Sequence, residues 1–122
     1  LRLRPDLPSA HMNRALAWLA QRDFARGLPE YEWRLQTTAQ PVIQTLPRWH
    51  GEPIEQRTLL VHAEQGFGDT LQFVRFVPLA AQRAARVVLE VQPQLLPLLA
   101  PAAQAWRVTL IAQGTPRPAA PH

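Results

Sequence analysis

The segment 59–73 limits the possible folds of this chain more than any other. An apolar run from Leu59 to Ala63 ends at a turn that contains Gly66 and Gly68, and an amphipathic helical pattern begins at Asp69. This order predicts a strand, a tight loop and a helix N-terminus, the corner at which open α/β sheets bind ligands. The corner matters because one carboxylate, that of Asp69, stands at its tip.

Further strand and helix patterns follow this corner and give the order β-α-β-α-β. Apolar runs predict strands over 58–63, 87–91 and 107–112, and helical spacing predicts helices over 70–86 and about 93–100. Pro78 should kink the first of these helices near Val74. Right-handed crossovers place three parallel strands in the order third, second, first, which is half of a doubly wound sheet. The first strand then has an open edge, and the proline-rich tail 114–122 is expected to be disordered.

Residues 1–36 carry two helical patterns joined by a turn at 21–23. Ser9 is the expected N-cap of the first helix and Asp23 that of the second, which should run to about Leu35. Apolar residues recur at three- and four-residue steps in both patterns: Met12, Ala15, Leu16, Leu19 and Ala20, then Phe24, Leu28, Tyr31 and Leu35. We therefore expect an antiparallel helix hairpin.

Three residues of the second helical pattern carry specific expectations. Gly27 lets the two helices approach closely, and Pro29 should bend the second helix. Glu30 lies four residues from both Arg26 and Arg34 and can pair with either.

Residues 37–56 are rich in proline and glycine, so we expect a connector without regular structure. Trp49 lies in this connector. We expect its ring to pack the connector onto a neighbouring domain rather than to stack on a ligand.

Composition excludes several functional classes. The chain has no cysteine and no lysine, so thiolate metal sites, Schiff-base chemistry and a P-loop are excluded. Its 13 basic residues are scattered arginines and its net charge is +4, which indicates a solvated surface rather than a nucleic-acid interface. Leu71 stands where the dinucleotide fingerprint needs its third glycine, and the four histidines lack metal-ligand spacing. No stretch resembles a signal peptide or could cross a bilayer, so the cytoplasm is the default compartment.

Asp69 admits two interpretations. It can cap the helix, with Gln72 completing a capping-box pattern. Alternatively, an outward-facing carboxylate can act as the general base for a sugar hydroxyl. Three nearby residues are expected to be structural: His62 as a satisfied, partly buried histidine, Arg75 as a solvated arginine, and Glu90 as a residue inside the second strand.

Residues 57–91 resemble the start of heptosyltransferase-like glycosyltransferases with the GT-B fold. The resemblance rests on the strand 59–63, on Gly68-Asp69 and on Pro78. Residues 9–54 are similar to the last tetratricopeptide-like helix pair and connector of bacterial proteins that join such repeats to this transferase domain. The domains implied are a tetratricopeptide-like hairpin (1–36), the connector (37–56), a partial Rossmann-like unit (57–113) and the tail (114–122). Arg14, Gln21 and Pro29 depart from the repeat pattern.

The resemblance implies a role for each residue of the corner. Asp69 would be the base for the acceptor hydroxyl, and five neighbours would line the acceptor site: Gln65, Gly66, Phe67, Gly68 and Thr70. The partners implied are a sugar acceptor and a nucleotide-sugar donor, with no metal and no further cofactor. The donor-binding domain lies outside the chain, so the isolated chain should be inactive. The alternative is a non-catalytic interaction module, with a protein partner or self-association through the hairpin and the open sheet edge.

Overall fold

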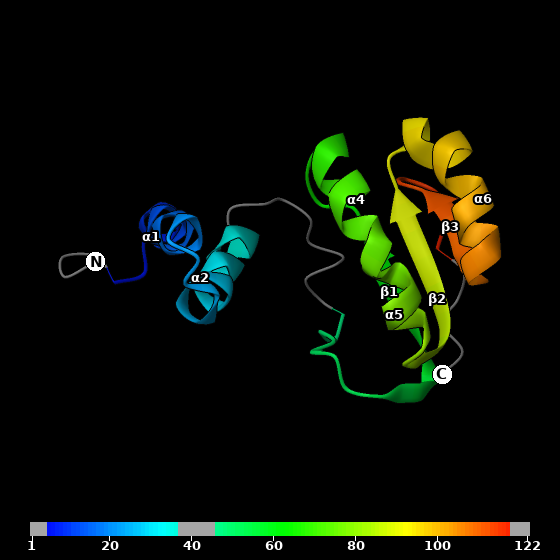
Figure 1. Ribbon diagram of the computed structural model, residues 1–122, viewed down its shortest axis with the longest axis horizontal. Coiled ribbons are helices and arrows are strands. Elements are labelled where there is room, and N and C mark those ends of the chain that lie inside the picture. The colour runs from blue at the N-terminus through cyan, green and yellow to red at the C-terminus, as the bar shows by residue number, and fades with distance from the viewer. Residues whose placement is uncertain (1–4, 37–45, 118–122) are drawn as a thin grey trace. The chain divides into compact units, whose positions relative to one another are not determined.

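The computed structural model describes residues 5–36 and 46–117, and the chain divides into two compact units, Leu1–Arg48 and Trp49–His122. The first unit is a helix hairpin and the second is an α/β unit (Figure 1). The expected fold class is therefore confirmed at this level. Residues 37–45 of the predicted connector and the last five residues of the tail lie outside the described residues.

The hairpin consists of α1 (Pro8–Ala20), α2 (Phe24–Tyr31) and the 3-10 helix η1 (Glu32–Gln36). The expected cap at Ser9 is wrong. Leu7 is the N-cap and Pro8 the first helical residue, where a missing N–H costs nothing. The cap at Asp23 is confirmed, because its Oδ1 accepts a hydrogen bond of 3.1 Å from the backbone N–H of Arg26. The α-helix ends two residues after Pro29 and continues as the tighter η1.

The two helices meet closely at Gly27, as expected. A Cβ atom at Gly27 would lie 2.7 Å from Leu19 Cδ2 and 3.2 Å from the backbone nitrogen of Leu19. The expected pairing of Glu30 along its own helix is wrong. Its carboxylate binds Arg14 and His11 of α1, and Arg26 pairs with Asp23 instead.

The predicted apolar stripes are only partly buried. Ala15 is fully buried, but Leu16 is 50% exposed and Phe24 and Leu28 are each 57% exposed. Spacing alone did not distinguish the side that faces the partner helix from the side that faces outward. The hairpin therefore presents large apolar side chains that it does not bury itself.

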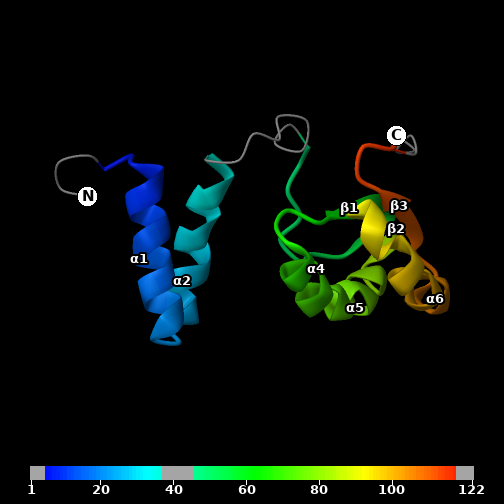
Figure 2. The same cartoon turned by 90° about the horizontal axis from the view of Figure 1, so that it is seen from above.

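The second unit is built on three parallel strands, β1 (Ile54–His62), β2 (Ala84–Val91) and β3 (Thr109–Ala112), in the order β1-β2-β3. This is the predicted order. Both connections advance in the same direction, so right-handed crossovers carry their helices over the same face of the sheet. The covering helices are α4 (Phe67–Phe73), η2 (Val74–Phe76), α5 (Val77–Ala81), η3 (Pro93–Leu95) and α6 (Leu96–Trp106), as Figure 2 shows.

The core lies between the sheet and these helices. Buried strand residues meet buried helix residues there: Leu59, Val87, Leu89 and Val91 with Val77, Leu95 and Leu99. Trp49 packs against the same cluster, and its indole N–H donates to the carbonyl of Glu52 at 2.6 Å. The packing role expected for Trp49 is confirmed.

Several predicted boundaries need correction. The strand β1 begins at Ile54, inside the predicted connector, because the Ile54 N–H bonds to the Arg83 carbonyl at 2.6 Å. The helix predicted over 70–86 begins at Phe67 and ends at Ala81, and its break at η2 lies just before Pro78, as expected.

The final helix continues beyond its predicted end at Ala100, through Pro101 to Trp106. Arg107, in the left-handed conformation with φ 56°, ends it and shortens the third strand from the predicted 107–112 to 109–112.

The tail prediction is wrong for residues 114–117. Gly114 turns the chain with φ 84°, and Arg117 bonds to Glu90 at 2.7 Å. Residues 118–122 lie outside the described residues.

Candidate functional site

The corner between β1 and α4 lies at the carboxyl-terminal edge of the sheet. After His62 the chain turns, and Gly66 is the N-cap of α4 with an extended backbone, φ −75° and ψ 173°. The helix therefore starts at Phe67, three residues earlier than the expected first helical residue, Thr70. This change puts Asp69 in the first turn of the helix instead of before it.

The expected capping role of Asp69 is wrong, because Gly66 occupies the cap position. Asp69 is exposed, and within the described ranges its carboxylate makes no hydrogen bond and no ion pair. Its Oδ2 leans back toward the turn, 3.6 Å from where a Cβ of Gly66 would lie. An acidic side chain in a first helical turn interacts favourably with the positive end of the helix dipole. The carboxylate thus faces solvent and has no partner in the described part of the chain.

Two glutamines hold the corner in place, and the sequence interpretation did not include them. Gln92, buried at the end of β2, accepts a hydrogen bond from the Thr70 hydroxyl at 3.0 Å and donates to the Gln65 carbonyl at 2.9 Å. Gln113, just after β3, donates to the Ala63 carbonyl at 2.6 Å. A signal was present in the sequence: both residues directly follow predicted strands, and the carboxyl ends of parallel strands share one edge.

The six predicted site residues are brought together, but they differ in accessibility. Gln65, Gly66, Phe67, Gly68 and Asp69 are exposed. Thr70 is buried, and its hydroxyl is engaged with Gln92. A Cβ on Gly68 would meet no atom of the described residues within 4 Å, so the backbone there is open to an approaching group. The geometry thus gives Thr70 a supporting position beneath an exposed turn.

A second polar group lies beside the corner, on the other face of the sheet. His62 and Glu90 are register partners on β1 and β2. Glu90 is 4% exposed and accepts two hydrogen bonds from Arg117, at 2.7 and 3.2 Å. Hydrogen bonding to this carboxylate raises the pKa of Arg117 above its ordinary value, although partial burial opposes the shift.

We expected both ring nitrogens of His62 to have hydrogen-bond partners, and this expectation is wrong for one of them. Its Nδ1 is buried without a hydrogen-bond partner among the described residues. The expected position of Glu90 inside the second strand is confirmed, but its pairing with the tail was not foreseen.

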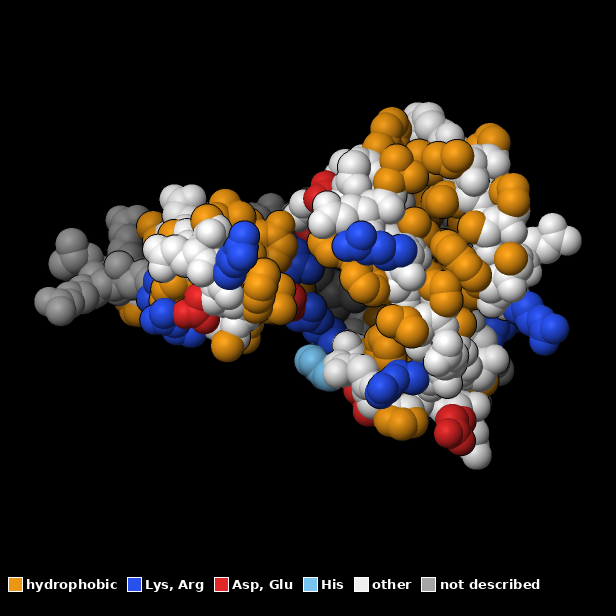
Figure 3. Space-filling model, in the orientation of Figure 1, with side chains coloured by type: hydrophobic (Ala, Val, Ile, Leu, Met, Phe, Trp, Pro, Cys, Tyr) orange, Lys and Arg blue, Asp and Glu red, His pale blue; other side chains and the backbone are white. Residues whose placement is uncertain are grey.

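The outer surface of the covering helices is apolar. Figure 3 shows hydrophobic side chains spread over α4, α5 and α6. Large side chains between 44% and 61% exposed contribute to this surface: Phe67, Leu71, Phe73, Phe76, Leu79 and Leu98. Arg75 is exposed, as expected, and its guanidinium lies 5.0 Å from the centroid of the Phe76 ring.

In the described residues, no group of three or more acidic or histidine side chains could hold a metal ion. No helix within those ranges is both long and apolar enough to cross a membrane. Comparisons of the chain with protein-family models, with curated proteins and with solved structures find no match. The function therefore has to be argued from the geometry of the corner.

Proposed function

We propose that the α/β unit is the acceptor-side segment of a glycosyltransferase that moves a sugar from a nucleotide sugar to a hydroxyl group. One observation carries the proposal: Asp69, an exposed carboxylate without a partner among the described residues, stands on the first turn of a helix that follows a parallel strand. A general base needs an ionised side chain that can reach the hydroxyl proton. The resemblance to heptosyltransferase-like proteins of the GT-B fold assigns that role to the same residue.

The surroundings of Asp69 favour a binding surface. Gln92 and Gln113 fix the backbone of the turn from below, which leaves Gln65, Gly66, Phe67 and Gly68 exposed for an acceptor. A turn whose backbone is held by hydrogen bonds keeps the base in a constant position. A catalytic group held in the correct geometry lowers the entropic part of the reaction barrier. The proposal extends to a partial Rossmann-like unit, a tetratricopeptide-like hairpin and a cytoplasmic location, with the donor sugar held by a further domain.

Acceptor binding can be tested on the chain itself. Isotope-labelled protein titrated with free hexoses and heptoses should show saturable amide shifts at residues 65–70. Gln94→Ala, an exposed change after β2, is the matched control and should leave these shifts unchanged. Shifts elsewhere, or none at millimolar sugar, would count against an acceptor site at the corner.

The catalytic role requires a protein in which this chain is joined to a donor-binding domain. There, Asp69→Asn should lower sugar transfer by about 10²- to 10⁴-fold, the usual contribution of a general base. Acceptor affinity should change little, because the amide keeps the size of the side chain. The unfolding midpoint should also be preserved, since the carboxylate has no partner to lose. Transfer at the normal rate would exclude the role of Asp69 as base.

A second candidate function is a non-catalytic interaction module. The observation that favours it is the exposure of Leu16, Phe24 and Leu28 on the hairpin. Helical repeats bury such side chains against neighbouring repeats. If this function is the right one, Phe24→Ser with Leu28→Ser should abolish capture of a partner or self-association, and Asp69→Asn should have no effect. A monomeric chain whose behaviour is the same with and without the two serines would argue against it.

A further inference from the structure

The outer side of α6 is apolar, although a helix side that contacts water is normally polar. None of the 11 residues of α6 is charged. With the exception of one glutamine, the exposed residues of this helix are apolar: Pro97, Leu98, Ala100, Pro101, Gln104 and Ala105. A helix that is apolar on all sides is normally buried. The sheet covers the inner side of α6 alone, so the outer side is expected to have a further partner.

The same kind of surface continues over α4, η2 and α5. The rings of Phe73 and Phe76 lie 6.4 Å apart, and Leu79 is 58% exposed. Figure 3 shows the hydrophobic side chains of these elements and of α6 as one area of the α/β unit. Exposed apolar areas of this kind mark contacts with proteins or membranes. The apolar helix face is defined here by its large side chains: Phe67, Leu71, Phe73, Phe76, Leu79 and Leu98.

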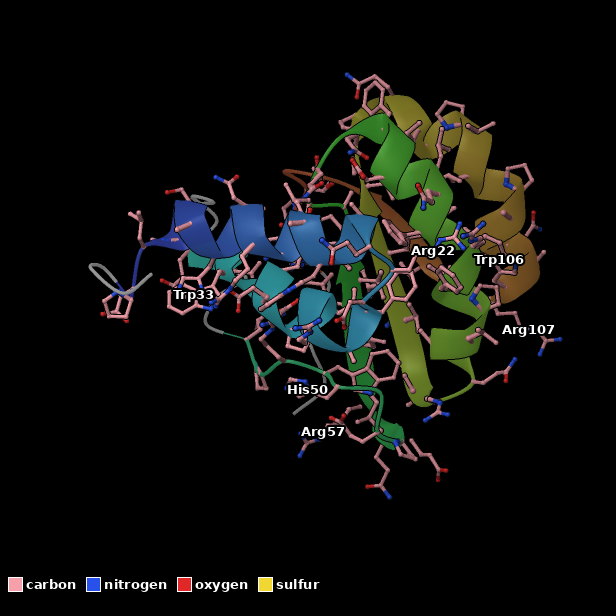
Figure 4. The ribbon with its side chains drawn as sticks, turned by 60° about the vertical axis from the view of Figure 1, so that its left-hand side comes forward. Arg22, Trp33, His50, Arg57, Trp106 and Arg107 are labelled. Carbon is pink, nitrogen blue, oxygen red and sulfur yellow. The ribbon has the colours of Figure 1, made fainter. Side chains whose placement is uncertain are left out.

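Arginines accompany the apolar helix face. Arg75 is exposed, and its guanidinium lies 5.0 Å from the centroid of the Phe76 ring. Arg107 is exposed at the end of α6, and Figure 4 shows its side chain directed outward on the helix side of the sheet. Arg83, which follows α5, is also exposed and donates to the Gly51 carbonyl at 2.6 Å. The apolar area is therefore bordered by positive charge.

Negative charge is scarce in the same part of the chain. From residue 70 to residue 122 the sequence has one acidic residue, Glu90. Glu90 is 4% exposed and bonds to Arg117. Among the covering helices, an acidic side chain is present only at the start of α4, where Asp69 lies in the first turn. The charge of this face thus complements an anionic partner.

The arrangement of the helices favours a flat partner. Figure 2 shows α4, α5 and α6 at one level on the same side of the sheet, so their outer side chains point toward a common plane. A bilayer surface is flat, admits phenylalanine and leucine side chains at the boundary of its acyl chains, and presents phosphate groups to arginine. A second copy of this face would instead bring like charges together, which opposes association.

We propose that the apolar helix face binds the surface of a bilayer that contains anionic lipids. The exposed phenylalanine and leucine side chains enter the boundary between head groups and acyl chains. Arg75 and Arg107 bind lipid phosphates with their guanidinium groups, while their aliphatic stems cover apolar surface. This binding involves the helix layer and does not depend on sugar transfer at Asp69.

Flotation of the full chain with lipid vesicles tests the proposal. One set of vesicles contains phosphatidylcholine alone, and the other contains phosphatidylcholine and phosphatidylglycerol in equal parts. We expect binding to the mixed vesicles to be at least about tenfold stronger, because each arginine near an anionic surface strengthens binding by about fivefold. Added salt should weaken this binding, because it screens the charges. No binding to the mixed vesicles, or equal binding to both sets, would overturn the proposal.

Two pairs of serine substitutions test the apolar contribution. Phe76→Ser with Leu79→Ser should weaken binding to the mixed vesicles by at least about tenfold, because two large apolar side chains no longer enter the bilayer. Phe24→Ser with Leu28→Ser is the matched control, since these side chains are similarly exposed but belong to the hairpin. The control should bind as the unmodified chain does. If the hairpin pair weakens binding and the helix pair does not, the proposed face is wrong.

Two charge reversals test the position of the positive charge. Arg75→Glu should weaken binding to the mixed vesicles by at least about fivefold. Arg57→Glu changes the net charge equally, but Arg57 is exposed on β1, and Figure 4 shows it directed to the side opposite to Arg107. This control should leave binding unchanged, and an equal loss in both variants would overturn the proposal. If the serine variants fail to fold, the charge reversals decide the question alone.

The oligomeric state of the chain separates a bilayer from a second copy as the partner. Light scattering should give a monomer in the absence of vesicles. If the chain forms dimers that Phe76→Ser with Leu79→Ser dissociates, and the mixed vesicles remain unbound, the apolar helix face binds a second copy and the proposal is overturned.

Discussion

Gly27 is a position of the hairpin at which a larger residue has no room. A Cβ there would meet both the side chain and the backbone nitrogen of Leu19, and the backbone cannot give way as a flexible side chain can. We expect Gly27→Ala to destabilise the hairpin by about 1–3 kcal/mol through overpacking. Gly68→Ala is the matched control, because nothing lies within 4 Å of its Cβ position; alanine in place of this helical glycine should be neutral or stabilise by up to about 1 kcal/mol. Amide exchange resolved by residue would measure each effect in its own unit.

Gln92 is the residue on which the geometry of the corner depends most. Gln92→Ala removes its bonds to Thr70 and to the Gln65 carbonyl, and leaves buried polar groups with fewer partners. We expect a loss of about 1–3 kcal/mol in the free energy of unfolding of the α/β unit. Exchange of amides 65–69 should rise more than that of β2. The control Gln94→Ala should change stability by less than about 0.5 kcal/mol, because Gln94 is exposed. An unchanged corner in Gln92→Ala would show that Gln113 alone holds the turn.

At the same scale, the sequence predicted which residues meet at the corner but not which of them support it. Glycines and an aspartate after an apolar run identify a strand-to-helix turn. Gln92 and Gln113 lie 27 and 50 residues from their partners Gln65 and Ala63, and such distant hydrogen bonds follow from strand register. The cap was misassigned for a related reason. Asp69 is a favoured cap residue, but Gly66 already has the extended backbone that a cap requires.

Among the elements, α6 contains a proline where regular helices avoid one. Pro101 lies in the interior of the helix and has no N–H to donate to the carbonyl of Pro97, four residues earlier. Pro101 is exposed, so Pro101→Ala removes little packing. We expect this change to stabilise the α/β unit by about 1–2 kcal/mol, less than the full helical penalty, because proline also restricts the unfolded chain. Pro93→Ala should be nearly neutral, since Pro93 opens η3. Urea denaturation of both variants would test the difference, and equal effects would contradict it.

The contact between α1 and α2 through Glu30 should become weaker at acidic pH. Hydrogen bonds from Arg14 and His11 outweigh burial and keep the pKa of Glu30 low. A carboxyl group with a lowered folded-state pKa contributes stability above its unfolded pKa, about 4.3, and loses it as the pH falls through the folded value. Hairpin protection should therefore decline below about pH 4.5. Glu30→Gln should remove most of this decrease in protection at low pH. A smaller decrease should remain because of Glu32: burial would raise the pKa of Glu32, but Arg34 and Arg48 hold it below its ordinary value. If Glu30→Gln loses as much hairpin protection in acid as the unmodified chain, other titratable groups cause the loss.

Element order and topology could be predicted from the sequence, but element ends could not. Apolar runs and crossover handedness were sufficient for three parallel strands in order, since these depend on patterns many residues long. The observed ends of helices and strands differ from the predicted ends where the conformation or hydrogen bond of a single residue decides the boundary. Arg107 ends α6 in a left-handed conformation that few non-glycine residues adopt, and Ile54 joins β1 through a bond to Arg83. The tail prediction failed because Arg117 bonds to Glu90, a buried strand residue 27 positions earlier, and no local pattern in the sequence indicates that pairing.

For the molecule as a whole, the two units differ in how much they can stabilise themselves. The α/β unit buries a cluster that joins all of its layers: Leu59, Val77, Val87, Leu89, Val91, Leu95 and Leu99. The hairpin has three buried positions among its described residues, His11, Ala15 and Gly27, and leaves Phe24 and Leu28 more than half exposed. A chain of about 40–50 residues with so small a core is marginal in water.

We therefore expect residues 49–122 to fold alone, with the amide spectrum that the same residues give in the full chain. Residues 1–48 alone should show less than about half of the helical signal that α1 and α2 imply, because short helices need tertiary packing. Helicity of this fragment should rise with protein concentration if Phe24 and Leu28 become buried between copies, and Phe24→Ser should prevent that rise. The reverse result, a stable monomeric hairpin and an unfolded α/β fragment, would mean that the sheet obtains part of its stability from the hairpin, and that the corner with Asp69 depends on residues outside its own unit.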